Sequence, residues 1–197
     1  MFTVVGLGNP GKEYRDTRHN VGWMVLSVIV EERKLPSFSE STRYRALISE
    51  GVIEHTDVAM LLPMTFMNNS GLSVSRFLKD HECLERLVVV HDDVDLPFGD
   101  IRVSYDRGAG GHNGVQSIID TCATKNFARI RVGVAQKSFL DGEARRPLGE
   151  ALSDFVLGKF SKSEREQLGA ISKKVDEALV HIFEKGVEHA MQEVNKG

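Results

Sequence analysis

The hydrophobic pattern of the chain alternates between short apolar runs and longer segments with helical spacing. The continuous run at 2–5 predicts a buried strand, and glycines follow it directly. A helix with one buried face is predicted next, because apolar residues recur there at the i, i+3, i+4 spacing. These residues are Val21, Met24, Val25, Val28 and Ile29. The segment 35–42 has neither period and is expected to be a polar connection.

The same alternation continues to the end of the chain. Strands are predicted at 44–53, 57–62, 87–90, 101–105 and 128–135. Helices are predicted around 74–81, 115–122 and 148–157, and from about residue 163 onward. Strands that alternate with helices are typical of the α/β class. We therefore expect a single domain over residues 1–197, with a twisted mixed β-sheet sandwiched between helices.

The charge of the chain is unevenly distributed. The net charge of −3 excludes a uniformly basic nucleic-acid-binding protein. Between Pro97 and Pro147, however, eight Lys and Arg stand against five Asp and Glu, which makes this stretch +3 and the remainder −6. A basic face of this kind is suited to holding phosphates. An ordinary solvated surface is an equally good reading of the charge alone.

The first residues are also informative about location. They lack the basic and then apolar pattern of a signal peptide, and no apolar run reaches the length of a membrane span. Cys83 and Cys122 lie far apart without a metal-binding or redox spacing. Buried thiols in a reducing cytoplasm are expected, and a disulfide between them is the alternative.

Gly6, Gly8 and Gly11 match the G-x-G-x-x-G spacing of dinucleotide-binding proteins, and they follow a predicted strand. In those proteins a helix begins within the glycines, whereas here Pro10 and a polar stretch delay it until about Asn20. No acidic residue follows at the end of a second strand. A nicotinamide-cofactor enzyme is therefore the weaker alternative. The glycines instead predict a loop that a ligand approaches closely.

His19 and Asp92 are the first candidates for chemistry. His19 lies between the first strand and the first helix, and Asp92 follows the buried strand at 87–90. If the two strands are parallel neighbours, both side chains lie at the carboxyl edge of the sheet. A carboxylate beside an imidazole fixes its tautomer and raises its basicity, as a base that activates water requires. Asp93 and Asp95 are expected only to cap or solvate a turn.

Other residue types narrow the chemistry further. No serine or cysteine has the G-x-S-x-G setting of an activated nucleophile, so a hydrolase with this sequence is expected to use water directly. His91 lies beside carboxylates, but no second ligand cluster accompanies it, and no metal is expected. Amides in three successive loops are able to stabilise an oxyanion without adding charge. They are Asn9, Asn68 and Asn113, although each also has a structural reading in a turn, and Asn113 as a helix N-cap.

Six segments together resemble one enzyme family. The segments GLGNPGKEYRDTRHNVGW, TFMNNSG, HDDVDLPFG, GAGGHNG, RIRVGV and FVLGKF are similar, in order and spacing, to the motifs of bacterial-type peptidyl-tRNA hydrolases. The resemblance covers the chain from Val4 to the last helix. It implies a monomeric, cytoplasmic esterase that frees tRNA from peptidyl-tRNA, that binds the acceptor stem and 3′ end, and that needs no metal and no cofactor.

The resemblance also implies roles for individual residues. His19 matches the histidine that deprotonates the attacking water, and Asp92 matches its carboxylate partner. The expected substrate contacts are Asn9, Tyr14, Phe66, Met67, Asn68 and Asn113. Arg131 matches a position associated with the 5′-phosphate of tRNA, and Arg102 and Arg107 are expected to assist it.

The chain departs from the family pattern at two places. Ser104 stands where the family usually has a lysine that helps to hold the phosphate. The connection at 136–152 is also longer than usual. A relative that binds RNA without hydrolysing an ester is the main alternative function, and a basic rim alone is sufficient for it.

Overall fold

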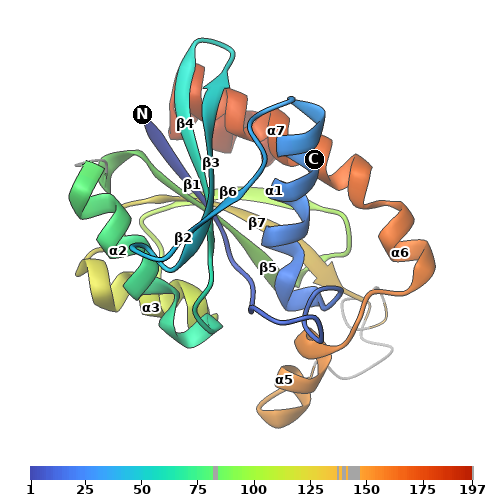
Figure 1. Ribbon diagram of the computed structural model, residues 1–197. Helices are drawn as coiled ribbons and strands as arrows, with labels where there is room; N and C mark the ends of the chain where they lie inside the picture. The colour runs from blue at the N-terminus through green and yellow to red at the C-terminus, as the bar shows by residue number, and fades with distance from the viewer. Residues whose placement is uncertain (82–83, 137, 139–140, 142–146, 197) are drawn as a thin grey trace.

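The computed structural model describes residues 1–81, 84–136, 138, 141 and 147–196. A central sheet separates two layers of helices (Figure 1). Its strands are β1 (Phe2–Gly6), β2 (Ser39–Ser41), β3 (Ala46–Ile53), β4 (Thr56–Pro63), β5 (Leu87–Pro97), β6 (Ile101–Tyr105) and β7 (Ala128–Ala135). Their spatial order is β2-β3-β4-β1-β5-β7-β6.

The sheet is mixed, as the sequence predicts. Strands β4, β1, β5 and β7 run parallel, whereas β2–β3, β3–β4 and β6–β7 are antiparallel pairs. Val4 of β1 pairs with Val88 of β5. The first strand and the strand before Asp92 are therefore parallel neighbours, which is the condition under which the sequence brings His19 and Asp92 together.

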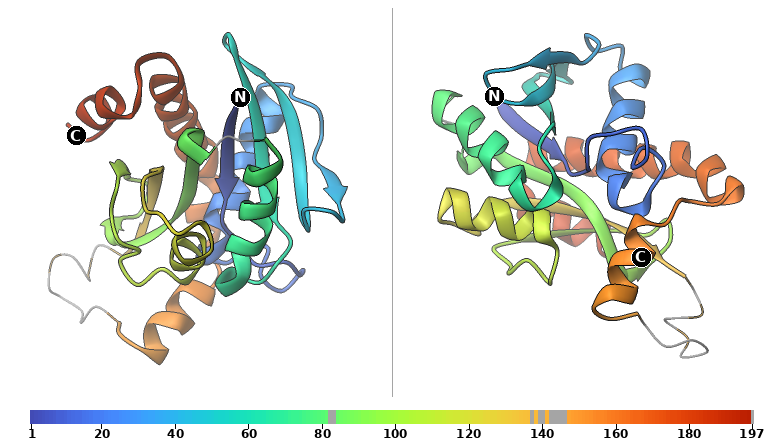
Figure 2. Two further views of the ribbon diagram at one scale, coloured as in Figure 1. Left: turned by 90° about the vertical axis from the view of Figure 1, so that its left-hand side faces the viewer. Right: turned by 60° about the horizontal axis from the view of Figure 1, so that its bottom comes forward.

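Helices cover both faces of this sheet (Figure 2). One layer holds α1 (Val21–Glu32), α7 (Leu168–Lys185) and α8 (Val187–Val194), and the other holds α2 (Ser70–His81) and α3 (Asn113–Cys122). The short helices are α5 (Glu150–Leu157), α6 (Lys162–Glu166) and the 3₁₀ turns η1 (Arg18–Asn20), η2 (Met67–Asn69) and η3 (Leu84–Arg86).

The strand residues alternate between the two layers. Val88 and Val90 pack against α1 and α7, whereas Leu87 and Val89 pack against α2 and α3. A strand covered on both faces has no polar side. This double burial explains why the segment 87–90 is continuously apolar.

Four details differ from the prediction. The connection at 35–42 contains β2, a short polar edge strand whose sequence carries no apolar signal. Strand β5 continues to Pro97, so Asp92, Asp93 and Asp95 lie in a strand and not in a turn. On α1, Leu26 and Val30 are buried, while the predicted Met24 and Val28 are half-buried. The C-terminal helix is divided into α6, α7 and α8.

Gly6, which ends β1, and Gly8 serve packing and not ligand access. A Cβ atom on Gly6 would lie 2.6 Å from the carbonyl oxygen of Gly22, and one on Gly8 would lie 2.6 Å from the Trp23 ring. At Gly22 itself a Cβ atom would lie 2.5 Å from the Val90 carbonyl oxygen and 2.6 Å from the Leu7 amide nitrogen. Helix α1 therefore lies directly on the carboxyl end of β1 and on β5 at Val90.

Two sequence predictions concern cysteines and membranes. Cys122 is a half-buried free thiol whose pKa is raised by burial, and Cys83 lies outside the described residues. Within the described part of the chain, no helix has the length and apolar character that crossing a membrane requires.

The close contact at Gly22 gives a test of this packing. Gly22→Ala should lower the free energy of unfolding by about 1–3 kcal/mol, because overpacking outweighs the better helix propensity of alanine. Urea denaturation measures the change. Gly169→Ala in α7 is the matched control, because a Cβ atom there meets nothing within 4 Å. The control should be neutral or stabilising, and an equally neutral Gly22→Ala would contradict the packing constraint.

Candidate active site

One cavity of about 1210 Å³ opens at the carboxyl ends of β1, β4 and β5. Most of the sequence-predicted site residues line it, namely Asn9, His19, Phe66, Met67, Asn68, Asp92, Arg102, Arg107, Asn113 and Arg131. Tyr14 is not among the lining residues. Its ring lies edge-on against Phe66, with 6.4 Å between the centroids.

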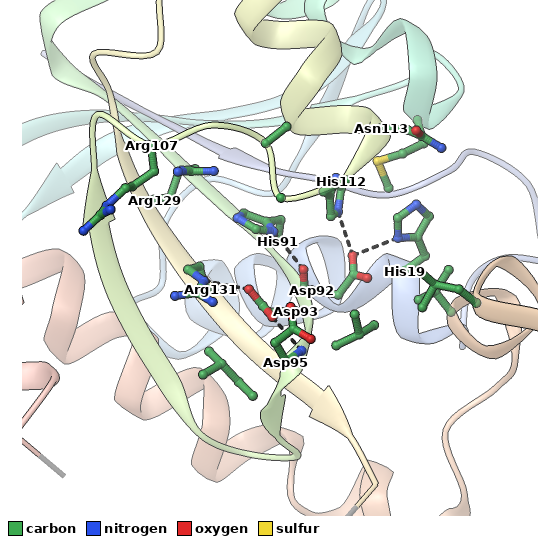
Figure 3. A pocket seen from close by; sticks show the side chains of 18 of the residues that line it. His19, His91, Asp92, Asp93, Asp95, Arg107, His112, Asn113, Arg129 and Arg131 are labelled. Atoms are coloured by element: carbon green, nitrogen blue, oxygen red, sulfur yellow. Dashed lines mark hydrogen bonds and ion pairs between the residues drawn. The ribbon is translucent and has the colours of Figure 1, made fainter. Parts of the chain in front are cut away.

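His19 and Asp92 are in direct contact, as expected (Figure 3). Nδ1 of His19, in η1, lies 2.8 Å from Oδ1 of Asp92, in β5. A carboxylate accepts, so Nδ1 carries the proton and the Nε2 lone pair is left for a reactant in the cavity. Burial by itself lowers the pKa of His19, but the charge and hydrogen bond of Asp92 outweigh it and raise the pKa.

A second imidazole, His112, reaches the same carboxylate oxygen. Its Nε2 lies 2.9 Å from Oδ1 of Asp92, and its Nδ1 accepts from the backbone N–H groups of Gly114 and Val115 at 3.1 and 3.3 Å. Because Nδ1 accepts two hydrogen bonds, the ring proton is on Nε2 and is donated to Asp92. His112 is therefore the N-cap of α3, a role that the sequence left open for Asn113, and Asn113 is the first residue of the helix.

The sequence analysis missed His112. The signal was present in the motif GAGGHNG, where a histidine directly precedes a predicted helix. Histidine is not among the usual N-cap residues, which are Ser, Thr, Asp and Asn. Its proximity to Asp92 is a tertiary contact between residues 20 positions apart and has no local signature.

Asp92 is held as a carboxylate by these two donors. It is 4% exposed, and burial by itself would raise the pKa of its carboxyl group, but His19 and His112 outweigh burial and hold the pKa well below its usual range. His91 donates from Nδ1 to the backbone oxygen of Asp92 at 2.8 Å. The pKa of His91 is lowered well below its ordinary value, chiefly by burial. His91 therefore stays neutral, and its hydrogen bond fixes the backbone of Asp92.

His19, Asp92 and His112 also have the composition of a metal site, with one ligand atom from each within 4.8 Å of the others. The hydrogen bonds argue against a metal. To bind a cation through Nε2, His112 must carry its proton on Nδ1, where two backbone N–H groups already point. The three residues therefore fit a hydrogen-bonded set better than a metal centre.

Amide side chains from the loop after β1, from η2 and from the start of α3 also line the cavity. Oδ1 of Asn9 accepts from the backbone N–H of Met67 at 2.7 Å, which joins the loop after β1 to η2. Asn20 donates to the Asn9 backbone oxygen at 3.0 Å and accepts from its N–H at 2.9 Å. Asn68 and Asn113 are exposed, and their side chains bond to no described residue. These two amides are free to contact a ligand.

The arginines line the other end of the cavity. Nε of Arg131 donates to Oδ2 of Asp93 at 2.6 Å, so Asp93 orients an arginine and does not merely solvate a turn. Arg102 donates to the backbone oxygen of Asn195, beyond α8. Arg107 is exposed in the loop after β6.

Arg129 is a further residue that sequence analysis missed. It is only 3% exposed, donates from Nη1 to the Gly108 oxygen at 2.9 Å, and has no ion pair within the described residues. Burial and the charges of Arg131 and Arg107 lower its pKa. Arg129 pairs across the strands with Ser104, which stands where the resembled family has lysine. The positive charge that Ser104 lacks is thus present on Arg129, its neighbour on the adjacent strand.

Comparisons of the chain with known proteins agree on a single family. The sequence model of the family described as peptidyl-tRNA hydrolase matches residues 3–197. A peptidyl-tRNA hydrolase from Syntrophotalea carbinolica is 38% identical over 197 residues, which cover 99% of this chain and 97% of that protein. One from Thermodesulfovibrio yellowstonii is 37% identical over 199 residues, with 100% of both chains covered.

A solved structure agrees with the sequence comparison. The crystal structure of peptidyl-tRNA hydrolase from Acinetobacter baumannii superposes with a TM-score of 0.85 and 32% identity. The superposition covers 100% of this chain and 95% of that chain. The similarity therefore includes the elements on both faces of the sheet and those around the cavity.

Substitution of His112 separates its two contacts. Asparagine is a strong N-cap but is too short to reach Asp92, so His112→Asn should keep the cap of α3 and remove one donor from the carboxylate. Asp92 then stabilises the imidazolium of His19 more strongly, and the pKa of His19 should rise. Titration of the His19 ring by NMR measures this change.

His112→Ala is the companion variant, because it removes both contacts. It should be less stable than His112→Asn by about 1 kcal/mol, the usual value of an N-cap. Both variants should raise the pKa of His19. An unchanged pKa in both would show that His112 does not modulate the His19–Asp92 pair.

Proposed function

The chain belongs to the peptidyl-tRNA hydrolase family and hydrolyses the ester between a peptide and the 3′ ribose of tRNA, and we propose that His19 and Asp92 carry out this reaction by activating water. The observation that carries the proposal is the hydrogen bond from His19 Nδ1 to Asp92 at 2.8 Å. It leaves Nε2 as the proton acceptor on the wall of the cavity.

The proposed reaction has two steps. Nε2 of His19 takes a proton from water while the water oxygen bonds to the ester carbonyl carbon, and Asp92 stabilises the imidazolium that forms. The tetrahedral intermediate then breaks its bond to the 3′ oxygen of the ribose. His19 returns the proton to this oxygen, so the products are the peptide acid and free tRNA.

The amides are suited to the charge that develops on the carbonyl oxygen. Asn68 and Asn113 lie in the cavity lining with unbonded side chains, and an amide N–H stabilises an oxyanion without a competing positive charge. Asn9 and Met67 position the peptide side of the ester, and Phe66 with Tyr14 offers an exposed aromatic edge for the 3′ end of tRNA.

The arginine end of the cavity is suited to the tRNA phosphates. Asp93 engages Nε of Arg131, which leaves the Nη donors for the paired contact that arginine makes with phosphate. Arg102 and Arg107 extend this face, and the buried charge of Arg129 supports it from beneath. The protein is further proposed to act in the cytoplasm as a monomer, without metal or cofactor.

The alternatives receive less support. A dinucleotide enzyme requires open glycines after β1, whereas Gly6 and Gly8 pack against Gly22 and Trp23. An RNA-binding relative without catalysis has no need for His19 bonded to a buried Asp92 beside unbonded amides. The unusual length that the sequence analysis expects for the connection at 136–152 stays a prediction, since 137, 139–140 and 142–146 lie outside the described residues.

Removal of the imidazole tests the catalytic proposal. His19→Ala should lower the single-turnover rate on an N-blocked aminoacyl-tRNA by about 10²–10⁴-fold, the contribution of a general base, with EDTA present throughout. In the wild type kcat/KM should rise with pH through a pKa above the ordinary 6.5, because only neutral His19 accepts a proton.

His55→Ala is the matched control, because His55 is exposed in the turn between β3 and β4. It should keep full activity. A fully active His19→Ala would exclude His19 as the base, and binding of tRNA without cleavage by the wild type would favour the RNA-binding alternative.

The phosphate face, formed by Arg131, Arg102 and Arg107 at the arginine end of the cavity, gives a separate prediction for tRNA binding. Arg131→Ala should weaken tRNA binding and reduce the slope of log K against log salt by about 0.7–0.9, the value of one lost phosphate contact. Arg43→Ala is the control, since Arg43 pairs with Asp80 near α2 and does not line the cavity. An unchanged slope for Arg131→Ala would remove this residue from the phosphate face.

A further inference from the structure

The side chain of Arg18 points away from the cavity although Arg18 directly precedes His19. It is 8% exposed and reaches the segment between α5 and α6. Nη1 donates to the Lys159 oxygen at 3.0 Å, and Nη2 lies 3.3 and 3.4 Å from the two carboxylate oxygens of Glu164. Neither the sequence motifs nor the proposed reaction explains this buried guanidinium.

Aromatic rings complete the enclosure of this guanidinium. Its carbon lies 4.7 Å from the centroid of the Phe155 ring and 5.5 Å from that of Phe160. A cation held over an aromatic face and desolvated in this way is bound more firmly than one at an exposed site. Arg18 therefore has few alternative positions.

Glu164 is itself fixed before it meets Arg18. It accepts from the Ser161 backbone N–H at 2.6 Å, and its own N–H donates to the Ser161 hydroxyl at 3.2 Å, which forms the capping box of α6. Partial burial by itself raises the pKa of Glu164, but the bonds from Ser161 and the charge of Arg18 outweigh it and lower the pKa. The partner of Arg18 is thus a rigid carboxylate.

Backbone bonds join the same two segments. The Arg18 N–H donates to the Gly158 oxygen at 3.0 Å, the Phe160 N–H donates to the Asp16 oxygen at 3.0 Å, and Thr17 pairs with Lys159 in an antiparallel bridge. Residues 16–18 and 158–160 therefore form a short ladder. His19 follows one strand of this ladder and α5 precedes the other strand, so His19 and α5 lie at the same end of the ladder.

Helix α5 is a wall of the cavity. Leu152, Ser153, Val156 and Leu157 line the cavity from this helix. In Figure 2, α5 lies beside the loop that carries η1 and projects from the sheet layers. A ligand that contacts α5 therefore contacts the helix directly before Gly158 and Lys159, to which Arg18 is bonded.

We propose that Arg18 is a positioning residue, which holds His19 in line with Asp92 by clamping η1 to the 155–164 segment, so that the α5 wall and the base form one rigid unit. This inference rests on the proposed role of His19. Its consequence is that the chemical step depends on a residue that touches neither substrate nor the reacting atoms.

Three variants test the clamp in the full-length protein. Arg18→Ala should lower kcat for an N-blocked aminoacyl-tRNA by about 10–100-fold, because a misplacement of about 1 Å costs this much, while KM changes by less than about 3-fold. Arg18→Lys should recover part of the loss, since lysine keeps the charge but not the forked geometry. Glu164→Gln should lower kcat less, and adding it to Arg18→Ala should cause no further loss.

The pH profile distinguishes positioning from a general loss of structure. A looser His19–Asp92 bond stabilises the imidazolium less, so the acid limb of kcat/KM should move to lower pH in Arg18→Ala. The groups that face His19 are Asp92 from β5 and His112 from the N-terminus of α3, and both remain in every variant. Arg18→Lys should have an intermediate profile.

Arg33→Ala is the matched control. Arg33 is also paired with carboxylates, those of Asp176 and Glu54, but it joins the end of α1 to α7 away from the cavity. It should lower the melting temperature with kcat unchanged. If Arg18→Ala is unfolded at the assay temperature, Arg18→Lys and Glu164→Gln carry the same test.

Even if the Arg18 variants are impaired, two results would overturn the clamp. The first is a loss of kcat in the Arg18 variants while the acid limb of their kcat/KM profile stays at the wild-type pH. The second is a rise in KM with kcat unchanged, which would make Arg18 a binding residue. Activity of His19→Ala is measured in parallel. If His19→Ala is fully active, His19 is not the base. If His19→Ala is inactive while the wild type and the Arg18 variants are fully active, the clamp alone is rejected.

Discussion

A single buried carboxylate determines how the proposed active site is assembled. Asp92 accepts hydrogen bonds from His19 and His112 on the same oxygen, at 2.8 and 2.9 Å. A carboxylate without such donors would be costly to bury in its charged form. The three segments that carry these residues must therefore meet at Asp92, within β5. The sheet order and the contact of α1, at Gly22, with the end of β1 and with Val90 of β5 make this meeting possible.

The backbone contributes as much as the side chains to this arrangement. His112 is oriented by two N–H groups at the start of α3, and the Asp92 backbone is held by His91. The extension of β5 beyond Val90 keeps Asp92 in a rigid strand. Catalytic groups placed on such elements keep their geometry better than groups on mobile loops.

The cavity has two electrostatic halves that match the two chemical parts of the substrate. Neutral amides and imidazoles surround the place proposed for the ester, where an added positive charge would oppose protonation of His19. Arginines line the half proposed for the phosphates, and Asp93 orients Arg131 there. The net charge of −3 for the whole chain conceals this division, because the acidic residues lie mainly elsewhere in the sequence.

The sequence by itself determined the α/β class and indicated the pairing of His19 with Asp92 on the condition that β1 and β5 are parallel neighbours, because strand burial and the carboxyl-edge rule are read from local patterns. It misjudged Gly6 and Gly8, and it missed His112, Arg129 and the partners of Arg18. These features depend on contacts between segments far apart in the chain, such as Arg18 with Glu164. Local patterns report which face of an element is buried, whereas only the tertiary structure decides which donor and acceptor meet there and in which tautomer.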